Sequence, residues 1–154
     1  MERKLKLAYC AGFFDGEGSI SLLKRERMYK EMTTTYFLRA SVGQKDGATL
    51  DWMKDKFGGN VFFVKRDGSF LWVVTDKSAY DFVKELQPFL KYKNPQALLA
   101  IEFYEKYVLP RKSAGARTRL TQEEISERED YFNQMKALKK VFIKSTYTKS
   151  SNND

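Results

Sequence analysis

The sequence changes its pattern abruptly at Gly18, and this change constrains the fold more than any other feature. Residues 5–14 are apolar on nearly every side, whereas alternation of apolar and polar residues begins directly after Gly18. Ala8, Ala11 and Gly12 lie three and four positions apart, so they share one face of a helix. Their small side chains would let another backbone approach closely. The chain is therefore expected to place a helix with a small-residue face directly before a sheet.

Two alternating runs follow that helix, and a second pair of β-rich runs flanks Asp67-Gly68, which is a strong hairpin signal. Helical patterns occupy the remaining segments, and Gly58-Gly59 supplies a C-terminal stop for the helix between the two strand pairs. The expected strands are residues 19–28, 33–44, 61–65 and 70–75, and the expected helices are residues 5–14, 50–57, 79–87, 95–109 and 122–143. The fold class is therefore α+β, with an antiparallel four-stranded sheet that has helices on one face.

Local signals set the ends of the later helices. Ser78 is a good N-cap, and Pro88 is expected to end the helix that Ser78 begins. Pro95 fits the first turn of the next helix, which is expected to end before Pro110. Thr121 opens a TQEE capping box, which predicts the start of the last helix.

The chain has the size of one ordinary domain. Its 154 residues, 42% of them hydrophobic, suffice for one core, and we expect a single domain over residues 1–145 with a flexible tail over residues 146–154. The apolar run near the N-terminus is too short to span a bilayer and lacks the features of a signal peptide. We therefore expect an intracellular protein, in an organelle or in a prokaryotic cytoplasm, without a membrane partner.

Composition excludes several kinds of catalytic site. The single cysteine, Cys10, cannot form an internal disulfide, and the absence of histidine removes zinc sites built from cysteine and histidine. Catalysis by Ser-His or Cys-His pairs is excluded for the same reason. Carboxylates, lysines and a hard metal ion remain as the candidate chemistry.

Positive charge favours a polyanionic partner, because 28 Lys and Arg outnumber 20 Asp and Glu and give a net charge of +8. The sheet face away from the helices would carry basic and hydrogen-bonding side chains, which suits double-stranded DNA. An ordinary solvated sheet face is the alternative interpretation. The residues expected to contact DNA are Ser21, Leu23, Arg25, Arg27, Thr35, Phe37, Arg39, Ser41, Lys65, Arg66, Val73 and Thr75.

Two carboxylates spaced by glycines follow the first helix, within the segment CAGFFDGEGSI of residues 10–20. Gly16 and Gly18 are expected to permit a tight turn in which a backbone carbonyl can approach a ligand. Glu17 and Asp15, with the carbonyl of Gly16, would then suit Mg²⁺. Taken alone, the DGEG tetrapeptide favours the simpler interpretation of an acidic, glycine-rich turn after a core helix, in which Asp15 serves to orient the backbone.

The segment from Cys10 to Gly18 resembles the LAGLIDADG motif of homing endonucleases, with Cys10 for the leading apolar residue and Glu17 in place of the second acid. The resemblance implies that family's saddle-shaped sheet. One motif per chain implies a homodimer with both motif helices at its centre. The residues expected at this dimer interface are Ala8, Ala11 and Gly12.

Two further segments extend the resemblance to single-motif members of the family. VGQKD, which contains Gln44, resembles the end of a strand where a glutamine positions water in the active site. LQPFLKYK resembles a segment whose second lysine reaches the active site, and that lysine is Lys93 here. The resemblance thus implies Glu17, Gln44 and Lys93 as catalytic residues, whereas without it both Gln44 and Lys93 are equally ordinary surface residues.

The implied activity is that of an intron-encoded, site-specific DNA endonuclease. The resemblance implies a pseudo-palindromic target and a double-strand break with short 3′ overhangs, made with Mg²⁺. We expect Mn²⁺ to substitute and Ca²⁺ to support binding without cleavage. An RNA-splicing maturase and a non-cleaving DNA-binding protein on the same fold remain alternatives.

The last part of the chain matches the family least. Its basic side chains are expected either to contact phosphates or to be solvated. They are Arg111, Lys112, Arg117, Arg119, Lys139 and Lys140. The sequence also departs from some relatives after Gln44, where Asp46-Gly47-Ala48 replaces an additional basic residue.

Overall fold

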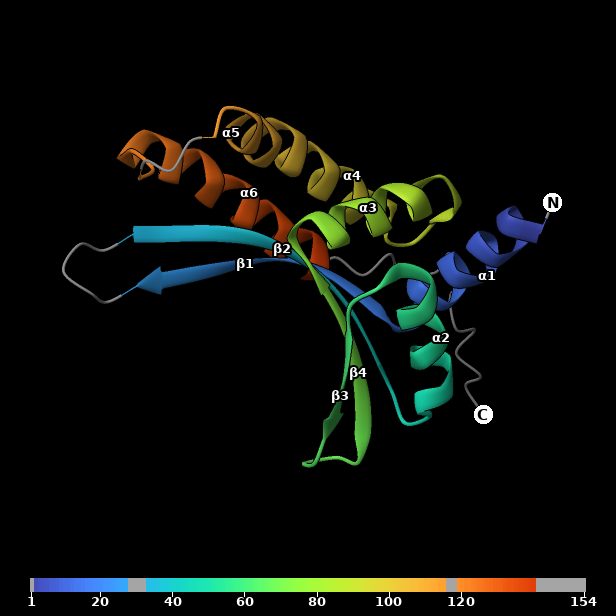
Figure 1. The fold of residues 1–154 in the computed structure, drawn as a ribbon. Coiled ribbons are helices and arrows are strands. Elements are labelled where there is room, and N and C mark those ends of the chain that lie inside the picture. Colours follow the sequence, from blue (N-terminus) through green and yellow to red (C-terminus); the bar gives the residue numbers. More distant parts are fainter. Residues whose placement is uncertain (1, 28–32, 116–118, 141–154) are drawn as a thin grey trace, which may run out of the picture.

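The computed structural model of the chain describes residues 2–27, 33–115 and 119–140 (Figure 1). The strands are β1 (Gly18–Arg27), β2 (Thr33–Gln44), β3 (Asn60–Val64) and β4 (Ser69–Thr75). The α-helices are α1 (Glu2–Glu17), α2 (Gly47–Phe57), α3 (Asp76–Leu86), α4 (Asn94–Phe103), α5 (Leu109–Ser113) and α6 (Gln122–Lys140). A short 3-10 helix, η1 (Gln87–Phe89), follows α3, and a π-helical turn, η2 (Tyr104–Val108), joins α4 to α5.

The four strands form one antiparallel sheet in the order β1-β2-β4-β3. Helices α3, α4 and α6 cover one face, and the opposite face is concave and uncovered (Figure 1). The β1–β2 hairpin and the β3–β4 hairpin project in different directions from the helices, which gives the sheet its saddle shape. The predicted fold class is therefore confirmed.

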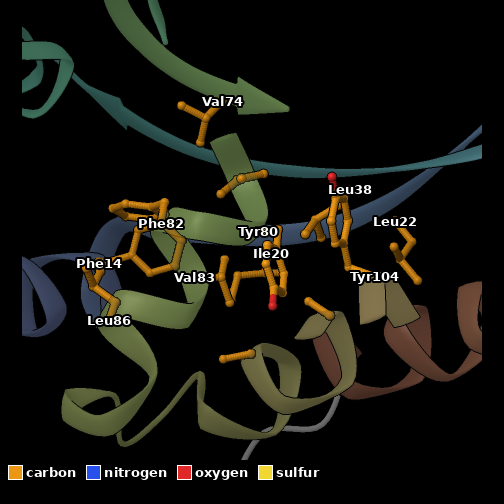
Figure 2. Close-up of a cluster of buried hydrophobic side chains, with 14 of the residues drawn as sticks. Phe14, Ile20, Leu22, Leu38, Val74, Tyr80, Phe82, Val83, Leu86 and Tyr104 are labelled. Carbon is orange, nitrogen blue, oxygen red and sulfur yellow. The ribbon is translucent and has the colours of Figure 1, made fainter. Parts of the chain in front are cut away.

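Aliphatic and aromatic side chains together fill the core between the sheet and the helices (Figure 2). The ring centroid of Phe82 lies 5.1 Å from that of Phe14 and 4.9 Å from those of Phe57 and Trp72. The Trp72 indole also donates a 2.9 Å hydrogen bond to the carbonyl of Gly58, which satisfies its polar group. Because Phe14 and Trp72 are both fully buried, this cluster fixes the end of α1 against the sheet.

Helix α1 runs directly into β1, so the expected tight glycine turn between them is wrong. Asp15, Gly16 and Glu17 form the last turn of the helix, three residues beyond its predicted end, and neither Gly16 nor Gly18 has a positive φ. Gly18 has a packing role instead, because a Cβ there would lie 2.3 Å from a ring carbon of Phe14. The close contact between strand and helix thus requires glycine at this position.

Two predicted helix ends are also wrong. Helix α3 begins at Asp76 after the N-cap Thr75, so Ser78 lies inside its first turn. Pro110 does not end its helix, since it occupies the first turn of α5. The π-helical turn just before Pro110 widens the backbone where the proline ring would otherwise meet a carbonyl of the preceding turn.

The capping box of the last helix is confirmed. The backbone N–H of Glu124 donates to the Thr121 hydroxyl at 3.2 Å, and the N–H of Thr121 donates to the Glu124 carboxylate at 3.3 Å. Three predictions concern residues that the structure does not describe. They are the role of Arg117, the end of this helix at residue 143 and the tail over residues 146–154. Within the described part of the chain, none of the helices is long and apolar enough to cross a membrane.

Candidate functional site

Asp15 links the end of α1 by hydrogen bonds to the segment that precedes α4. Its two carboxylate oxygens accept hydrogen bonds from the backbone N–H groups of Lys91 and Lys93, each at 2.8 Å. The Lys93 ammonium in turn donates to the backbone carbonyl of Asp15. These three bonds set the direction in which α1 ends and place Lys93 beside that end.

Glu17 is the exposed acid of this helix end. Within residues 2–27, 33–115 and 119–140, no group donates a hydrogen bond to its carboxylate. The C-terminus of a helix also carries partial negative charge, which favours a cation near Glu17 and the exposed Gly16. No cluster of three acidic or other metal-binding side chains occurs in the described part of the chain, so a metal here would rely on Glu17, backbone oxygens and groups from elsewhere.

Lys93 is nearly buried, with 9% of its surface exposed. Burial lowers the pKa of Lys93, and the nearby carboxylates of Asp15 and Glu17 oppose that shift. Its ammonium is held at the last turn of α1 by the hydrogen bond to Asp15, and its proton is easier to remove than that of a solvated lysine. A lysine in this setting can stabilise developing negative charge or take part in proton transfer.

Gln44 ends β2 next to the last turn of α1. Gly18 pairs with Val42, so Gln44 lies two residues beyond the start of β1, where α1 has just ended. It is half-buried, and the following Asp46 caps α2 by accepting a 3.0 Å hydrogen bond from the N–H of Ala48. The sequence Asp46-Gly47-Ala48 thus builds a helix start, which fixes the chain immediately after Gln44.

A small hollow opens beside Lys93 at the edge of β1. Lys139 reaches it from the end of α6 and donates a 2.6 Å hydrogen bond to the Ser21 hydroxyl. The amide oxygen of Gln96 is buried there without a hydrogen-bond partner among the described residues. The hollow is lined by Gly18, Ser19, Ile20, Tyr92, Lys93, Gln96 and Lys139. Sequence reasoning did not single out Ser19 and Gln96, because only the folded chain brings α4 and α6 to this edge.

The uncovered sheet face carries most of the residues predicted to contact DNA. Ser21 pairs with Arg39, and Arg25 pairs with Thr35, so these side chains share one face. The guanidinium of Arg25 lies 5.0 Å from the ring centroid of Phe37 on that face. The predicted residues that the strand register places there are Ser21, Leu23, Arg25, Thr35, Phe37, Arg39, Ser41, Val73 and Thr75. No described strand residue on this face is acidic.

One predicted contact, Lys65, differs in position. β3 ends at Val64, so Lys65 and Arg66 lie in the turn between β3 and β4, and the expectation that Lys65 belongs to the uncovered face is wrong. The strand period explains the error, because residues 61 and 63 face away from that surface. Arg27 belongs to β1, but its side chain lies outside the described residues.

The small-residue face of α1 divides between two environments. Ala11 is fully buried in the core of its own chain, so its assignment to a dimer interface is wrong. Ala8 and Gly12 are exposed, and a Cβ added to Gly12 would meet nothing within 4 Å. Leu5 and Tyr9 lie on the same exposed side and are 63% and 61% exposed. This apolar strip is the surface of α1 that remains free for a partner.

Comparison with known proteins places these features in a family. The sequence model of the LAGLIDADG endonuclease family matches residues 10–97, more than half of the chain. The chain is 35% identical over 108 residues to DNA endonuclease I-CreI of Chlamydomonas reinhardtii. That match covers 65% of this chain and 63% of the relative, so it spans less than two thirds of the relative's length.

Solved structures share the fold. The homing endonuclease I-CvuI, crystallised with a DNA target, matches with a TM-score of 0.74 and 21% identity over 92% of this chain and 87% of that one. An archaeal intron-encoded homing endonuclease, I-Vdi141I complexed with DNA, matches with a TM-score of 0.70 and 15% identity over 95% of this chain and 91% of that one. With the motif helix, the saddle-shaped sheet and the match over residues 10–97, this chain belongs to the LAGLIDADG endonuclease family.

Proposed function

We propose that the chain is a site-specific DNA endonuclease that acts as a homodimer and makes a metal-dependent double-strand break with short 3′ overhangs. One observation carries the proposal. Glu17 is an exposed carboxylate without a hydrogen-bond donor among the described residues, and the nearly buried Lys93 lies at the same helix end, where its ammonium donates to the carbonyl of Asp15. This pair lies where the uncovered basic sheet begins, so bound DNA would bring a phosphate to it.

The described residues suit Mg²⁺ as the metal. Glu17 and backbone oxygens at the end of α1 are hard ligands, and the helix C-terminus favours a cation. Bound Mg²⁺ would supply the charge that polarises a scissile phosphate and lowers the pKa of a water molecule. The related I-CvuI has been crystallised with DNA in the presence of Mg²⁺, where the DNA was not cleaved, and of Ca²⁺. We propose Mg²⁺ for cleavage, with Mn²⁺ as a substitute and Ca²⁺ as a metal for binding alone.

The chain's own groups then have distinct tasks. The Lys93 ammonium stabilises negative charge that develops on the phosphate, and the Gln44 amide holds the attacking water by a hydrogen bond. Arg39 and Arg25 neutralise DNA phosphates or contact bases from the uncovered face.

A second copy of the chain completes the enzyme. The exposed strip of Leu5, Ala8, Tyr9 and Gly12 would pack against the same strip of the partner, as a two-fold interface requires. Packing of the two α1 helices would bring both Glu17 residues to the centre, one for each DNA strand. The target would then be pseudo-palindromic.

Glu17→Gln tests the proposal. The amide keeps the size of the side chain but loses the charge that holds a metal, so cleavage should be lost while DNA binding in Ca²⁺ is unchanged or slightly tighter. Cleavage is measured on a plasmid that carries the intronless insertion site of the gene, with Mg²⁺ and with chelator, beside a gel-shift titration. Glu123→Gln, at an exposed position at the start of α6, is the matched control and should cut normally.

Wild-type cutting by Glu17→Gln would remove the central carboxylate from the mechanism, and undiminished cutting in chelator would remove the metal. Binding of the parent intron RNA without any cleavage of DNA would favour a maturase instead.

A further inference from the structure

The uncovered face has two parts with different chemistry. The β1–β2 part carries the cations Arg25 and Arg39, whereas the β3–β4 part carries no charged strand residue. The register places three rows of side chains across β3 and β4 on this face. They are Asn60 with Val73, Phe62 with Leu71, and Val64 with Ser69. An uncharged, largely apolar patch therefore adjoins a basic one on the same concave surface.

Phe62 is the most exposed of these apolar side chains that the structure describes, at 53%. It lies on β3, which is one of the two edge strands of the sheet, and its pairing partner Leu71 is only half-buried. A contiguous apolar patch on an edge strand is unfavourable in water and marks a surface that a partner covers. The patch continues the basic face, so the partner that covers it is the one that the basic face binds.

The major groove of DNA offers a matching surface only at A·T pairs. Thymine presents a methyl group that apolar side chains contact. Adenine presents a hydrogen-bond donor and an acceptor, and one Asn amide can bond to both at once. Guanine is recognised mainly by Arg or Lys, which the β3 and β4 strands lack on this face. Asn60 and Val73 lie opposite each other in one row, so an amide and an apolar group stand side by side.

Building on the proposed function, we infer that the β3–β4 part of the uncovered face recognises A·T base pairs in the major groove. Phe62, Leu71 and Val73 contact thymine methyl groups, and Asn60 bonds an adenine. Side chains on one face of a strand recur about every 6.7 Å, which matches roughly two base pairs of B-DNA. The three rows therefore cover about five consecutive base pairs in each half-site. RNA is a poor fit, because its A-form major groove is too deep and narrow for a strand to enter.

The test begins with selection of bound duplexes from a pool of randomised double-stranded DNA in Ca²⁺. The enriched half-site should contain a block of about five base pairs that is rich in A·T. Each thymine in it is then replaced by deoxyuridine, which removes only the methyl group. Every contacted methyl should contribute about fourfold in affinity, the equivalent of one buried methylene.

Two neighbouring phenylalanines supply the variant and its control. Phe62→Ala should abolish the effect of deoxyuridine at one or two adjacent positions and leave the others unchanged. Phe63 is similarly exposed, at 57%, but it faces the opposite side of the sheet, where its ring lies 5.2 Å from that of Phe70. Phe63→Ala should therefore keep the full deoxyuridine effect. Thermal unfolding of both variants shows whether the hairpin remains folded.

The outcomes separate the inference from the proposed function. The inference would be overturned if the selected target contained no A·T block, or if deoxyuridine left the binding affinity unchanged at every position of the block. Either result would leave the proposed function standing. Loss of the deoxyuridine effect in folded Phe63→Ala to the same extent as in Phe62→Ala would also overturn the inference. Failure to enrich any duplex would overturn both.

Discussion

Asp15 and Glu17 are two positions apart on one helix, and helix geometry gives them different surroundings. Successive residues are about 100° apart around an α-helix, so side chains at i and i+2 point in nearly opposite directions. Asp15 faces the segment before α4 and accepts two backbone hydrogen bonds from it, whereas Glu17 faces solvent. One acid thus holds the site together and leaves the other free to bind a ligand.

Asp15→Asn tests this division. An asparagine offers one carbonyl oxygen in place of two carboxylate oxygens, so one of the N–H groups of Lys91 and Lys93 would lose a charge-assisted acceptor. We expect a loss of about 1.5–3 kcal/mol in the free energy of unfolding, measured by urea denaturation. Cleavage should fall, but less than in Glu17→Gln, which should leave stability unchanged. Normal stability together with a complete loss of cleavage would instead make Asp15 a direct metal ligand.

The sequence pointed to the chemistry of the site better than to its surroundings. Glu17 and Lys93 followed from the motif and its companion segment, and the structure places both at the last turn of α1, where the Lys93 ammonium donates to the carbonyl of Asp15. Ala11 was assigned to the wrong side, because a helix that is apolar all round does not show which face enters the core. Lys139 could not be linked to Ser21, since their contact joins residues 118 positions apart.

Among the elements, α6 is fastened to the covered side of the sheet by a polar cluster. The hydroxyl of Tyr36 on β2 donates a hydrogen bond to Glu129 on α6, and Lys24 on β1 lies 3.3 Å from the same carboxylate. The bond from Tyr36 and the charge of Lys24 lower the pKa of Glu129, and desolvation opposes them. This cluster holds α6 in place and thereby helps to position Lys139 at the edge of β1.

Tyr36→Phe should lower the free energy of unfolding by about 1–2 kcal/mol at neutral pH, because a hydrogen bond to a charged group is lost at a nearly buried position. The pKa of Glu129 is lower in the folded than in the unfolded chain. Its contribution is therefore fully present above the ordinary glutamate pKa and is lost as pH falls through the lowered value. Urea denaturation of both proteins should accordingly show their difference shrinking below about pH 4. A constant difference down to acid pH would show that Tyr36 acts through packing rather than through Glu129.

Element boundaries were predictable where a local signal acts alone. The capping box at Thr121 and the stop at Gly58-Gly59 were correct, because each depends only on neighbouring backbone groups. The helix end predicted before Pro110 was wrong, since a π-helical turn precedes the proline and the helical segment continues into α5. The order β1-β2-β4-β3 was not predictable either, because the pairing of β2 with β4 depends on tertiary packing rather than on a turn.

At the scale of the whole molecule, the fold places the proposed DNA-binding, catalytic and dimerisation surfaces on different parts of the chain. The concave sheet face carries the cations and the apolar patch, the end of α1 carries Glu17, and the outer side of α1 carries an exposed apolar strip. Because Glu17 lies at the end of the same helix that presents the strip, pairing of two copies would determine the distance between their acids. In the proposed enzyme, assembly and double-strand cleavage are thus coupled through one helix.

Gly12→Leu should therefore separate the subunits without unfolding them. Gly12 is exposed inside α1, and a Cβ there meets nothing within its own chain, so a leucine should raise the helical stability of the monomer by up to about 1 kcal/mol. In a dimer, the same leucine would fill the space that the partner helix needs. Sedimentation velocity should show a monomer, and cleavage of both strands should be lost. Ser126→Leu, at an exposed position of α6, is the matched control and should remain a dimer that cuts normally. If Gly12→Leu sediments as a dimer and still cuts both strands, the exposed strip of α1 is not the interface, and the two acids must be brought together by another surface.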